Sequence, residues 1–281
     1  MTSLLDQVRS ARSFAADRFV PLEAGGRIGW IRRDRVAGLD RWPEIFAIEE
    51  GAVRLQAHLA SEAARSAALG EVALRLAKQG AISGWRHETY AIRVRLRDKP
   101  LFHLERAAMR FFGLTSQAAH LNGFVRSDRG LRLWMGRRRP TKEIDPGRLD
   151  TLVGGGIPSG QDARQTLVRE CFEGAGIEPA LAKRAKPAGM LEICNEEPAG
   201  LHSEILHAHD LELAADFRPR NVDGEVAEFH CLAASEVADR IANGEFTVDA
   251  GLLTLDFLAR NGAIAFTPEL LAALDQCRVR P

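Results

Sequence analysis

Two glutamates near the middle of the chain have a spacing suited to binding a metal ion. Glu170 and Glu173 are three residues apart in a stretch, from about 161 to 175, whose apolar pattern predicts a helix, so both carboxylates lie on one helix face. Two carboxylates on one face repel each other unless a cation lies between them. Hard divalent ions such as Mg²⁺ take oxygen ligands of this kind, often together with substrate phosphates. Solvated helices carry such pairs as well, so the pair needs support from the residues around it.

Glycines stand at both ends of this predicted helix. The glycine run at 154–156 lets the backbone turn sharply and approach a ligand closely, and Gly176 is expected to end the helix. Leu167, Cys171 and Ala175 recur at four-residue spacing on a neighbouring face. We therefore expect a glycine loop followed by a helix that is anchored in a core and directs its carboxylates toward a ligand.

The whole segment from 154 to 177 resembles the Nudix box. That motif reads G, five residues, E, seven residues, R-E-apolar, one residue, E-E, one residue, G-apolar. The matching positions in this chain are Gly155, Arg169, Glu170, Cys171, Glu173, Gly176 and Ile177. The resemblance implies a metal-dependent pyrophosphohydrolase that uses Mg²⁺ or Mn²⁺ and has an α/β (α+β) fold, the Nudix α/β/α sandwich with a mixed sheet.

The resemblance also implies roles for single residues. Glu170 and Glu173 are expected to be metal ligands and catalytic residues, and Arg169 is expected to orient a carboxylate by a charge-assisted hydrogen bond. Two positions depart from the motif, because Gln161 replaces its first glutamate and Gly174 replaces the second of its paired glutamates. Glutamine keeps the shape and some hydrogen bonding at a position that chiefly supports the loop. Glycine cannot supply the metal ligand usual at its position, so we expect weaker Mg²⁺ binding.

Family members often recruit a further acidic residue from outside the box. In the stretch DGEVAEF, at 223–229, Glu225 is the best candidate for a third metal ligand. Glu225 and Glu228 would face opposite sides of an extended strand, so at most one of them can reach the metal. A polar strand end that binds nothing is an equal alternative for this stretch, and Glu192 and Glu212 are weaker candidates.

Basic and aromatic residues before the box are candidates for binding the substrate. The residues predicted to contact it are Arg137, Arg139, Lys142, Gly155 and Gly156, with Arg138 in the same basic cluster. A solvated turn is the alternative reading of that cluster. Trp134 and Phe124 could stack on a heteroaromatic ring, although strand aromatics more often belong to a core. His87 and Tyr90 could cap the pocket, although Tyr90 packed in a core is the more common arrangement.

The rest of the chain predicts two domains that meet near residue 115. We expect a smaller N-terminal α+β domain at 1–115 and a Nudix hydrolase domain at 116–281. Patterns before the boundary predict a helix after Ser3, a hairpin at 25–39, a helical stretch from Ala52 to Gln79 that could divide near Gly70, a strand at 90–96 and a helix at 105–112. After it they predict a hairpin turning at 127–130, strands at 189–194, 205–213 and 226–232, and closing helices at 235–243 and 252–261.

Composition indicates an ordinary globular protein and disfavours two classes of partner. The chain has 281 residues, 46% of them hydrophobic and 27% charged, with 38 basic and 38 acidic side chains. A general nucleic-acid binder would carry a basic excess. No stretch approaches the roughly 18 apolar residues that a membrane span needs, and the four cysteines form no CxxC pair. We therefore expect a cytoplasmic, soluble protein with no nucleic acid or membrane as partner.

Segments outside the box resemble one branch of the family, the branch related to the Nudix half of thiamine pyrophosphokinase fusion proteins. The segments that carry this resemblance are GWRHETYAI at 84–92 and the stretches at 120–125, 133–156, 209–229 and 255–262. The resemblance implies a small-molecule diphosphate substrate, a damaged or modified thiamine diphosphate, that is cleaved to the monophosphate by a metal-activated water. Nudix proteins are often dimers, so a homodimer is possible.

Two other functions stay open from the sequence. A change such as Gly174 would suit a non-catalytic Nudix module that binds a ligand for regulation, since a fold does not guarantee its usual function. An enzyme acting on a nucleoside diphosphate derivative, such as ADP-ribose or an oxidised nucleotide, is the second. A metal titration would separate a sensor from an enzyme, and competition by thiamine monophosphate but not by AMP would separate the two substrates.

Overall fold

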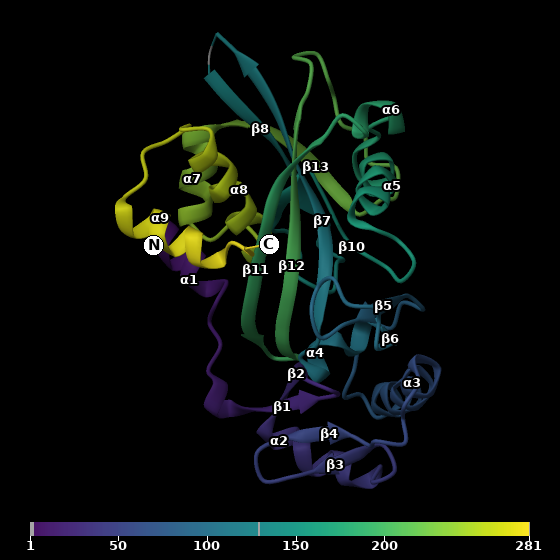
Figure 1. Cartoon of the computed structure of the whole chain (residues 1–281). Coiled ribbons are helices and arrows are strands. Elements are labelled where there is room, and N and C mark those ends of the chain that lie inside the picture. The colour runs from purple at the N-terminus through teal and green to yellow at the C-terminus, as the bar shows by residue number, and fades with distance from the viewer. Residues whose placement is uncertain (1–2, 129, 281) are drawn as a thin grey trace.

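In the computed structural model, which describes residues 3–128 and 130–280, a smaller lobe lies at one end of a larger one (Figure 1). The smaller lobe combines a four-stranded sheet, in the order β2-β1-β4-β3, with a two-stranded sheet of β5 and β6. Its elements are β1 (Phe19–Glu23), β2 (Arg27–Arg32), α2 (Arg33–Val36), β3 (Phe46–Ile48), β4 (Val53–Leu55), α3 (Glu62–Lys78), β5 (Thr89–Ile92), β6 (Phe102–Glu105) and α4 (Met109–Phe112). An apolar core that includes Leu22, Leu69 and Phe112 holds them together.

A mixed sheet forms the centre of the larger lobe. Its strand order is β11-β12-β7-β8-β13, while β10 pairs with β7 and β9 pairs with β8. Strands β7 and β12 run parallel, and the other neighbours run antiparallel. The strands are β7 (Thr115–Ser127), β8 (Gly130–Arg138), β9 (Leu149–Thr151), β10 (Val153–Gly156), β11 (Lys186–Glu197), β12 (Gly200–Glu212) and β13 (Val226–Ala233).

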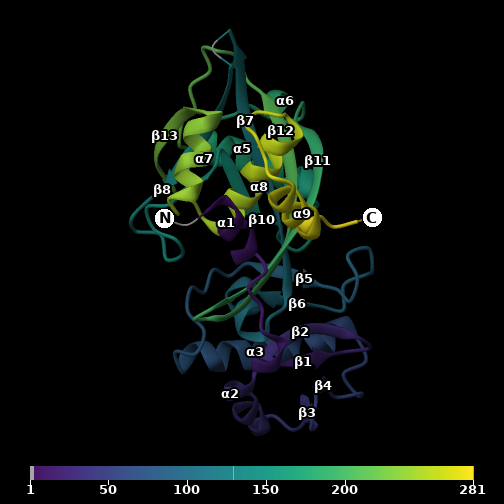
Figure 2. The ribbon, with the colours of Figure 1, turned by 90° about the vertical axis from the view of Figure 1, so that its left-hand side faces the viewer.

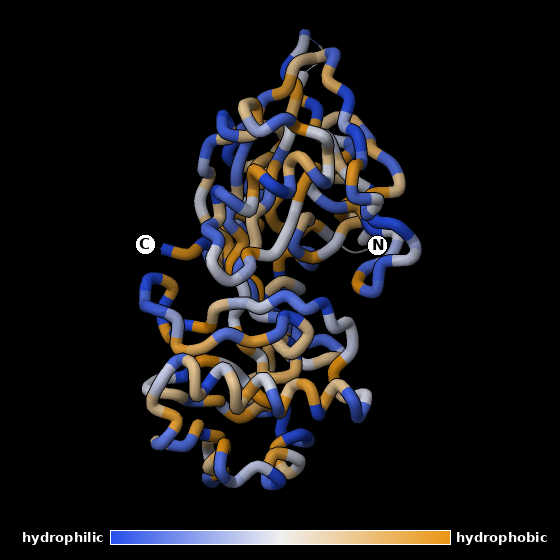
Figure 3. Tube along the Cα trace, turned by 90° about the vertical axis from the view of Figure 1, so that its right-hand side faces the viewer, coloured by the Kyte–Doolittle hydropathy of each residue, from blue (hydrophilic) through white to orange (hydrophobic). Residues whose placement is uncertain are grey.

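Helices cover both faces of this sheet (Figures 1 and 2). On one face lie α5 (Ala163–Ala175) and α6 (Pro179–Ala182), and on the other lie α1 (Leu4–Ser10), α7 (Ala234–Ala242), α8 (Val248–Arg260) and α9 (Pro268–Cys277). Leu121 and Leu167 belong to the first core, and Leu206 and Phe257 belong to the second. Along the strands and helices of both lobes, apolar residues alternate with polar ones (Figure 3). The expected α/β/α sandwich with a mixed sheet, accompanied by a smaller α+β region, is confirmed.

The first helix packs with the larger lobe, although the chain enters the smaller lobe directly after it. Ser3 and Asp6 form a capping box that starts α1, and Val8 is buried in the same core as α8 and α9. The chain then follows the edge of β11, where the amide of Cys194 donates to the Ala11 carbonyl at 2.7 Å. It returns to the larger lobe only at β7. The smaller lobe is therefore inserted between α1 and β7.

The sequence patterns erred in a few places. The stretch expected to be helical from Ala52 is a strand at 53–55 followed by one helix, α3, which passes through Gly70 without a break. A carbon added at Gly70 would meet no atom within 4 Å, so this glycine faces open space and needs no bend. The strand expected at 90–96 ends at Ile92, and the helix expected from 105 starts at 109 after a short 3₁₀ turn. Helix α9 was missed, although Thr267 caps it and Pro268 stands at its first position. In the predicted hairpin at 127–130, residue 129 lies outside the described residues.

Candidate active site

The glycine strand β10 lies beneath two functional side chains from different parts of the chain. It pairs antiparallel with β7, placing Gly155 opposite Ala119. A carbon added at Gly155 would lie 2.2 Å from the carboxyl carbon of Glu170, and one added at Gly156 would lie 1.8 Å from the Tyr90 hydroxyl oxygen. Side chains from α5 and from the smaller lobe thus rest directly on the glycine backbone, which explains why these positions lack side chains.

Helix α5 is fixed at both ends and along its inner face. Asp162 and Gln165 form a capping box at its start, and Gly176 ends it with a left-handed φ of 64°. Its apolar stripe, Leu167, Cys171 and Ala175, is buried as the sequence indicated. This packing determines which residues of the helix are free to face the glycine strand.

Arg169 joins the two glutamates of the box. Its guanidinium donates to Glu173 at 2.7 Å and pairs with Glu170 at 2.8 Å. The pKa of Glu170 is raised to about 7, chiefly by burial and also by the charges of Glu173 and Glu225, against the opposing effect of Arg169. A carboxyl that is buried among other carboxylates is one whose charged form a divalent cation would stabilise, so these residues fit the metal that the family resemblance implies.

The loop before β13 completes this acidic cluster. The amides of Val222 and Asp223 both donate to the Glu173 carbonyl at 3.0 Å, which holds the loop against the end of α5. Glu225 precedes the strand and forms an ion pair with Lys142. Burial, together with Glu225 and Glu173, raises the pKa of Asp223. The sequence did not single out Asp223 as a metal ligand, because the Asp-Gly pair at 223–224 predicts a turn.

The other acidic candidates lie elsewhere. Glu228 is within β13, where Arg137 donates to it at 2.7 Å and His230 lies 3.1 Å from it. Glu192 is on β11 and lies 3.8 Å from Arg12. Glu212 is exposed at the end of β12. The structure therefore groups Glu225, and not these three, with the box.

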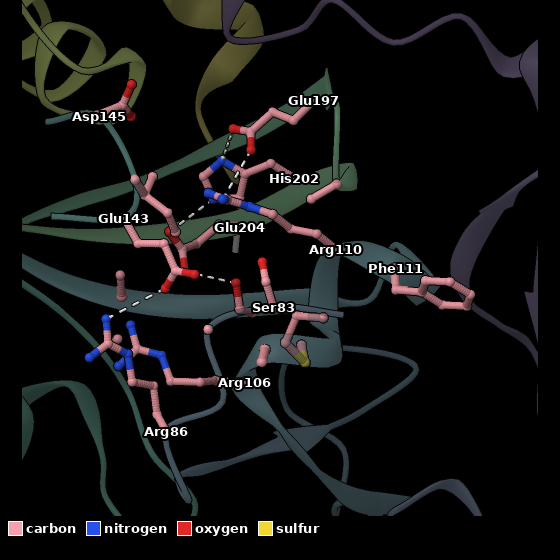
Figure 4. A pocket seen from close by; sticks show the side chains of 18 of the residues that line it. Ser83, Arg86, Arg106, Arg110, Phe111, Glu143, Asp145, Glu197, His202 and Glu204 are labelled. Carbon is pink, nitrogen blue, oxygen red and sulfur yellow. Dashed lines mark hydrogen bonds and ion pairs between the residues drawn. The ribbon is translucent and has the colours of Figure 1, made fainter. Parts of the chain in front are cut away.

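A cleft of about 840 Å³ separates the two lobes and reaches the glycine strand. Its arginines and lysine are Arg35, Arg86, Arg106 and Arg110 from the smaller lobe, Arg138 at the end of β8, and Lys142 after that strand. Figure 4 shows Arg86 and Arg106 on one side of the cleft, with Glu197, His202 and Glu204 together on another. The cleft thus offers cationic side chains and a histidine–carboxylate group, and Arg110 is paired with Glu197 of that group at 3.0 Å.

The structure distributes the predicted substrate-binding residues unevenly. Lys142, Gly155 and Gly156 line the cleft. Arg137 is held by Glu228 and by the Gly147 carbonyl at 2.8 Å, and it lies outside the cleft lining. Arg139 is exposed, also outside that lining, and its backbone amide donates to the Glu225 carbonyl at 3.1 Å.

The aromatic candidates differ in the same way. Tyr90 lines the cleft, its ring lies 5.6 Å from the Arg106 guanidinium, and burial raises the pKa of its hydroxyl. Trp134 and Phe124 are buried in the cores on the two faces of the sheet. His87 is exposed and lies outside the cleft lining. Arg86 and Arg106 were missed by the sequence analysis, although the stretch at 84–92 that includes Arg86 was noted.

Gln161 and Gly174, the two residues that depart from the box motif, are both in positions where the structure shows what surrounds them. Gln161 is exposed at the start of α5, and its side-chain oxygen accepts a hydrogen bond from Thr166 at 3.0 Å. The buried Nε of Arg169 has no hydrogen-bond partner among the described residues. A carbon added at Gly174 would meet no atom within 4 Å, so a larger side chain has room there.

The histidine–carboxylate group on the cleft wall carries opposite charges. His202 and Glu204 lie two residues apart on β12, and Asp249 lies at the start of α8. Burial opposes charging of His202, but Asp249, Glu197 and Glu204 outweigh it and raise the pKa of His202 to about 10. Burial likewise opposes the charge of Glu204, yet its contacts with His202 and Ser116 lower its pKa. Burial and the charge of Glu204 raise the pKa of Asp249, despite the opposing effect of His202.

Together, the α/β/α sandwich, the glycine strand and the carboxylate helix have the arrangement that the resemblance to the Nudix box implies. Comparison with known proteins identifies the family. A model described as NUDIX domain matches residues 120–250, and one described as Domain of unknown function (DUF4743) matches residues 2–116. The chain is 36% identical over 254 residues to Nudix hydrolase 24, chloroplastic, of Arabidopsis thaliana, covering 89% of this chain and 69% of the relative. It is 34% identical over 258 residues to Nudix hydrolase 20, chloroplastic, of the same plant, and this match covers 88% of this chain and 68% of that relative.

These relatives show that the chain belongs to the Nudix hydrolase family, whose members cleave phosphoric anhydride bonds and generally use divalent metals. A crystal structure of DR0079 from Deinococcus radiodurans is also similar, with 24% identity and a TM-score of 0.46 over 60% of this chain and 98% of that one. Among the described residues, no helix has the length and apolar character of a membrane span.

Proposed function

We propose that this chain hydrolyses the diphosphate of a small organic molecule held in the cleft between its lobes. The observation that carries the proposal is the position of Glu170, which is half-buried against Gly155 and lies close to the charges of Glu173 and Glu225. Glu170, Glu173 and Glu225 would hold Mg²⁺ or Mn²⁺ there. When bound, such an ion lowers the pKa of a water and offsets the charge of the diphosphate.

The chain's own residues then have separable tasks. Arg169 holds Glu170 and Glu173 in fixed positions relative to each other. Glu170 or Glu225 is the carboxylate that would orient the attacking water or accept its proton. Lys142, beside Glu225, can bind phosphate oxygens as they gain charge, and the glycine backbone leaves the substrate room to approach.

For the substrate, we propose a thiamine diphosphate derivative that is cleaved to the monophosphate. The cleft has cationic side chains, which would favour a diphosphate, and acidic side chains, which would favour a cationic or hydrogen-donating ring. The stretch at 84–92, which carries part of the branch resemblance, supplies Arg86 and Tyr90 to the cleft. The division into domains at 1–115 and 116–281 stays a prediction, and helix α1, at the start of the first range, packs on the larger lobe. The cytoplasmic location and the homodimer stay predictions.

Metal-dependent turnover of a panel of diphosphates tests the proposal. The panel contains thiamine diphosphate, oxidised thiamine diphosphates, ADP-ribose and oxidised dGTP, assayed with Mg²⁺ and with Mn²⁺. The Glu170→Gln protein serves as the blank. We expect turnover of a thiamine compound that disappears in the blank.

Other outcomes decide against parts of the proposal. Turnover of ADP-ribose or oxidised dGTP alone would reject the thiamine assignment and keep the hydrolase. Ligand binding without turnover under any metal would favour a regulatory module, for which the glycine at 174 is the motivating change.

A further inference from the structure

A second group of metal-ligating side chains lies on the cleft wall, apart from the box carboxylates. His202, Glu204 and Asp249 each offer one ligand atom, and these atoms all lie within 4.8 Å of one another. His202 and Glu204 are two residues apart on β12, so their side chains share one face of the strand. Their exposed fractions are only 8% and 9%, which distinguishes them from an acidic surface patch.

The histidine is oriented as metal-binding histidines are. Its Nδ1 lies 3.3 Å from a carboxylate oxygen of Glu197, and Glu197 is itself held by Arg110 at 3.0 Å. This leaves Nε2 facing Glu204, at 3.4 Å from its Oε2 (Figure 4). Histidines that bind metals commonly donate their other ring N–H to a carboxylate in this manner, because the bond fixes the ring and the tautomer.

Glu204 is held in the same way, through the oxygen that a metal would not use. The Ser116 hydroxyl donates to Glu204 Oε1 at 2.7 Å, so Oε2 is the oxygen directed at His202. Two ligand atoms that are each ~2.1 Å from a tetrahedral ion are ~3.4 Å apart. The observed separation of 3.4 Å between His202 Nε2 and Glu204 Oε2 already has this value.

Asp249 is the third potential metal-ligating residue, and it gives independent support for a site here. Thr247 caps α8 and so places Asp249 in the first turn, where its side chain lines the cleft. Within the described part of the chain, the Asp249 carboxylate forms no hydrogen bond and no ion pair within 4.0 Å. Asp249 is half-buried, and a carboxylate that is partly removed from water is stabilised by a paired charge or a metal. Here the nearest metal-ligating atoms belong to His202 and Glu204.

We propose that His202, Glu204 and Asp249 bind a divalent transition-metal ion, Zn²⁺ or Mn²⁺, at a site separate from that of the Nudix box. An imidazole beside two carboxylates suits these ions better than Mg²⁺, which prefers oxygen ligands alone. The three protein ligands leave a coordination position open toward the cleft for a water or a substrate atom. The ion replaces the proton on His202 Nε2, so its binding releases protons.

Zinc and manganese binding to the full chain, treated with chelator beforehand and studied without substrate, tests this site. Titration calorimetry would compare the wild type with Asp249→Asn, with Glu204→Gln, and with a Glu170→Gln/Glu173→Gln protein that lacks the box ligands. We expect Asp249→Asn and Glu204→Gln each to weaken one binding event by at least ~10-fold, and the box variant to retain that event. Asp150→Asn is the matched control, because Asp150 also lines the cleft but is paired with Arg138 at 3.0 Å.

Anomalous scattering at the zinc edge from soaked crystals gives a second readout. We expect a peak between His202 Nε2, Glu204 Oε2 and Asp249. A peak at the box alone, or unchanged affinity in both Asp249→Asn and Glu204→Gln, would overturn the proposal. Because the box variant retains this site whether or not the enzyme turns over diphosphates, failure here is distinguishable from failure of the proposed function.

Discussion

Replacing Gly156 with alanine should destabilise the protein through one contact between its lobes. The added carbon would lie 1.8 Å from the Tyr90 hydroxyl oxygen and 2.7 Å from the ring carbon that bears it. Tyr90 cannot easily retreat, because it is 6% exposed and belongs to β5, which is paired with β6 at Leu104. The φ of Gly156 lies outside the left-handed region, so the cost is steric and not conformational. Overpacking of this kind costs about 1–3 kcal/mol.

A double-mutant cycle with Tyr90→Leu assigns that cost to the contact. Leucine lacks the atoms that the new methyl group would meet, so Gly156→Ala should become at least ~1 kcal/mol less costly in the Tyr90→Leu background. Urea unfolding followed by tryptophan fluorescence measures all four proteins, provided that each unfolds in a single transition. Gly174→Ala is the steric control, because its added carbon meets no atom within 4 Å. Costs that add within ~0.5 kcal/mol would refute the reasoning.

Three further predictions concern Gly174 in the box helix, Glu225 in the loop before β13, and His202 on the cleft wall. Gly174→Ala should raise the free energy of unfolding by about 0.5–1 kcal/mol, because glycine is a poor helix former. Gly174→Glu should in addition bind Mg²⁺ more tightly, as measured by calorimetry. Equal Mg²⁺ affinity in both variants would show that a glutamate at this position does not reach the ion. Glu225→Gln should lower metal-dependent turnover by ~10-fold or more, whereas Glu228→Gln, whose carboxylate is bound to Arg137, should change it little; the reverse order would exchange their roles. The pKa of His202 is raised by folding, so its stabilising contribution, on the order of a few kcal/mol, is fully present below about pH 6.5 and is lost as the pH rises toward 10. With chelator present, His202→Gln should therefore flatten the decline of unfolding free energy across that range, and an unchanged slope would contradict the assignment.

Local patterns predicted the part of the site that is continuous in sequence. The apolar stripe of α5 and Gly176 each carry a signal that acts within a few residues, so the helix that holds Glu170 and Glu173 was predicted correctly. The basic cluster was only partly predicted. Neighbours on a strand such as Arg137 and Arg138 point to opposite faces, and only the tertiary pairing of β8 with β13 decides which of them meets Glu228.

Contacts between the lobes could not be predicted in this way. Arg86, Arg106 and Tyr90 line the cleft because the smaller lobe folds back on the sheet, and no periodicity records that arrangement. His202 and Asp249 are likewise brought together by the packing of α8 on β12. Polar residues two apart in an otherwise buried strand were the signal that could have drawn attention to His202 and Glu204.

The insertion of the smaller lobe between α1 and β7 limits how the cleft can open. A lobe attached by one linker could swing widely, but this one is connected to the sandwich by two chain segments. The first of these is itself held along β11, where the Ala11 carbonyl accepts from Cys194 and Glu196 pairs with Arg18 at 2.7 Å. Two connections hinder rotation of one lobe against the other more than a single linker would. The contact of Tyr90 with Gly156 in the cleft therefore depends in part on how the segment after α1 is held at the edge of β11.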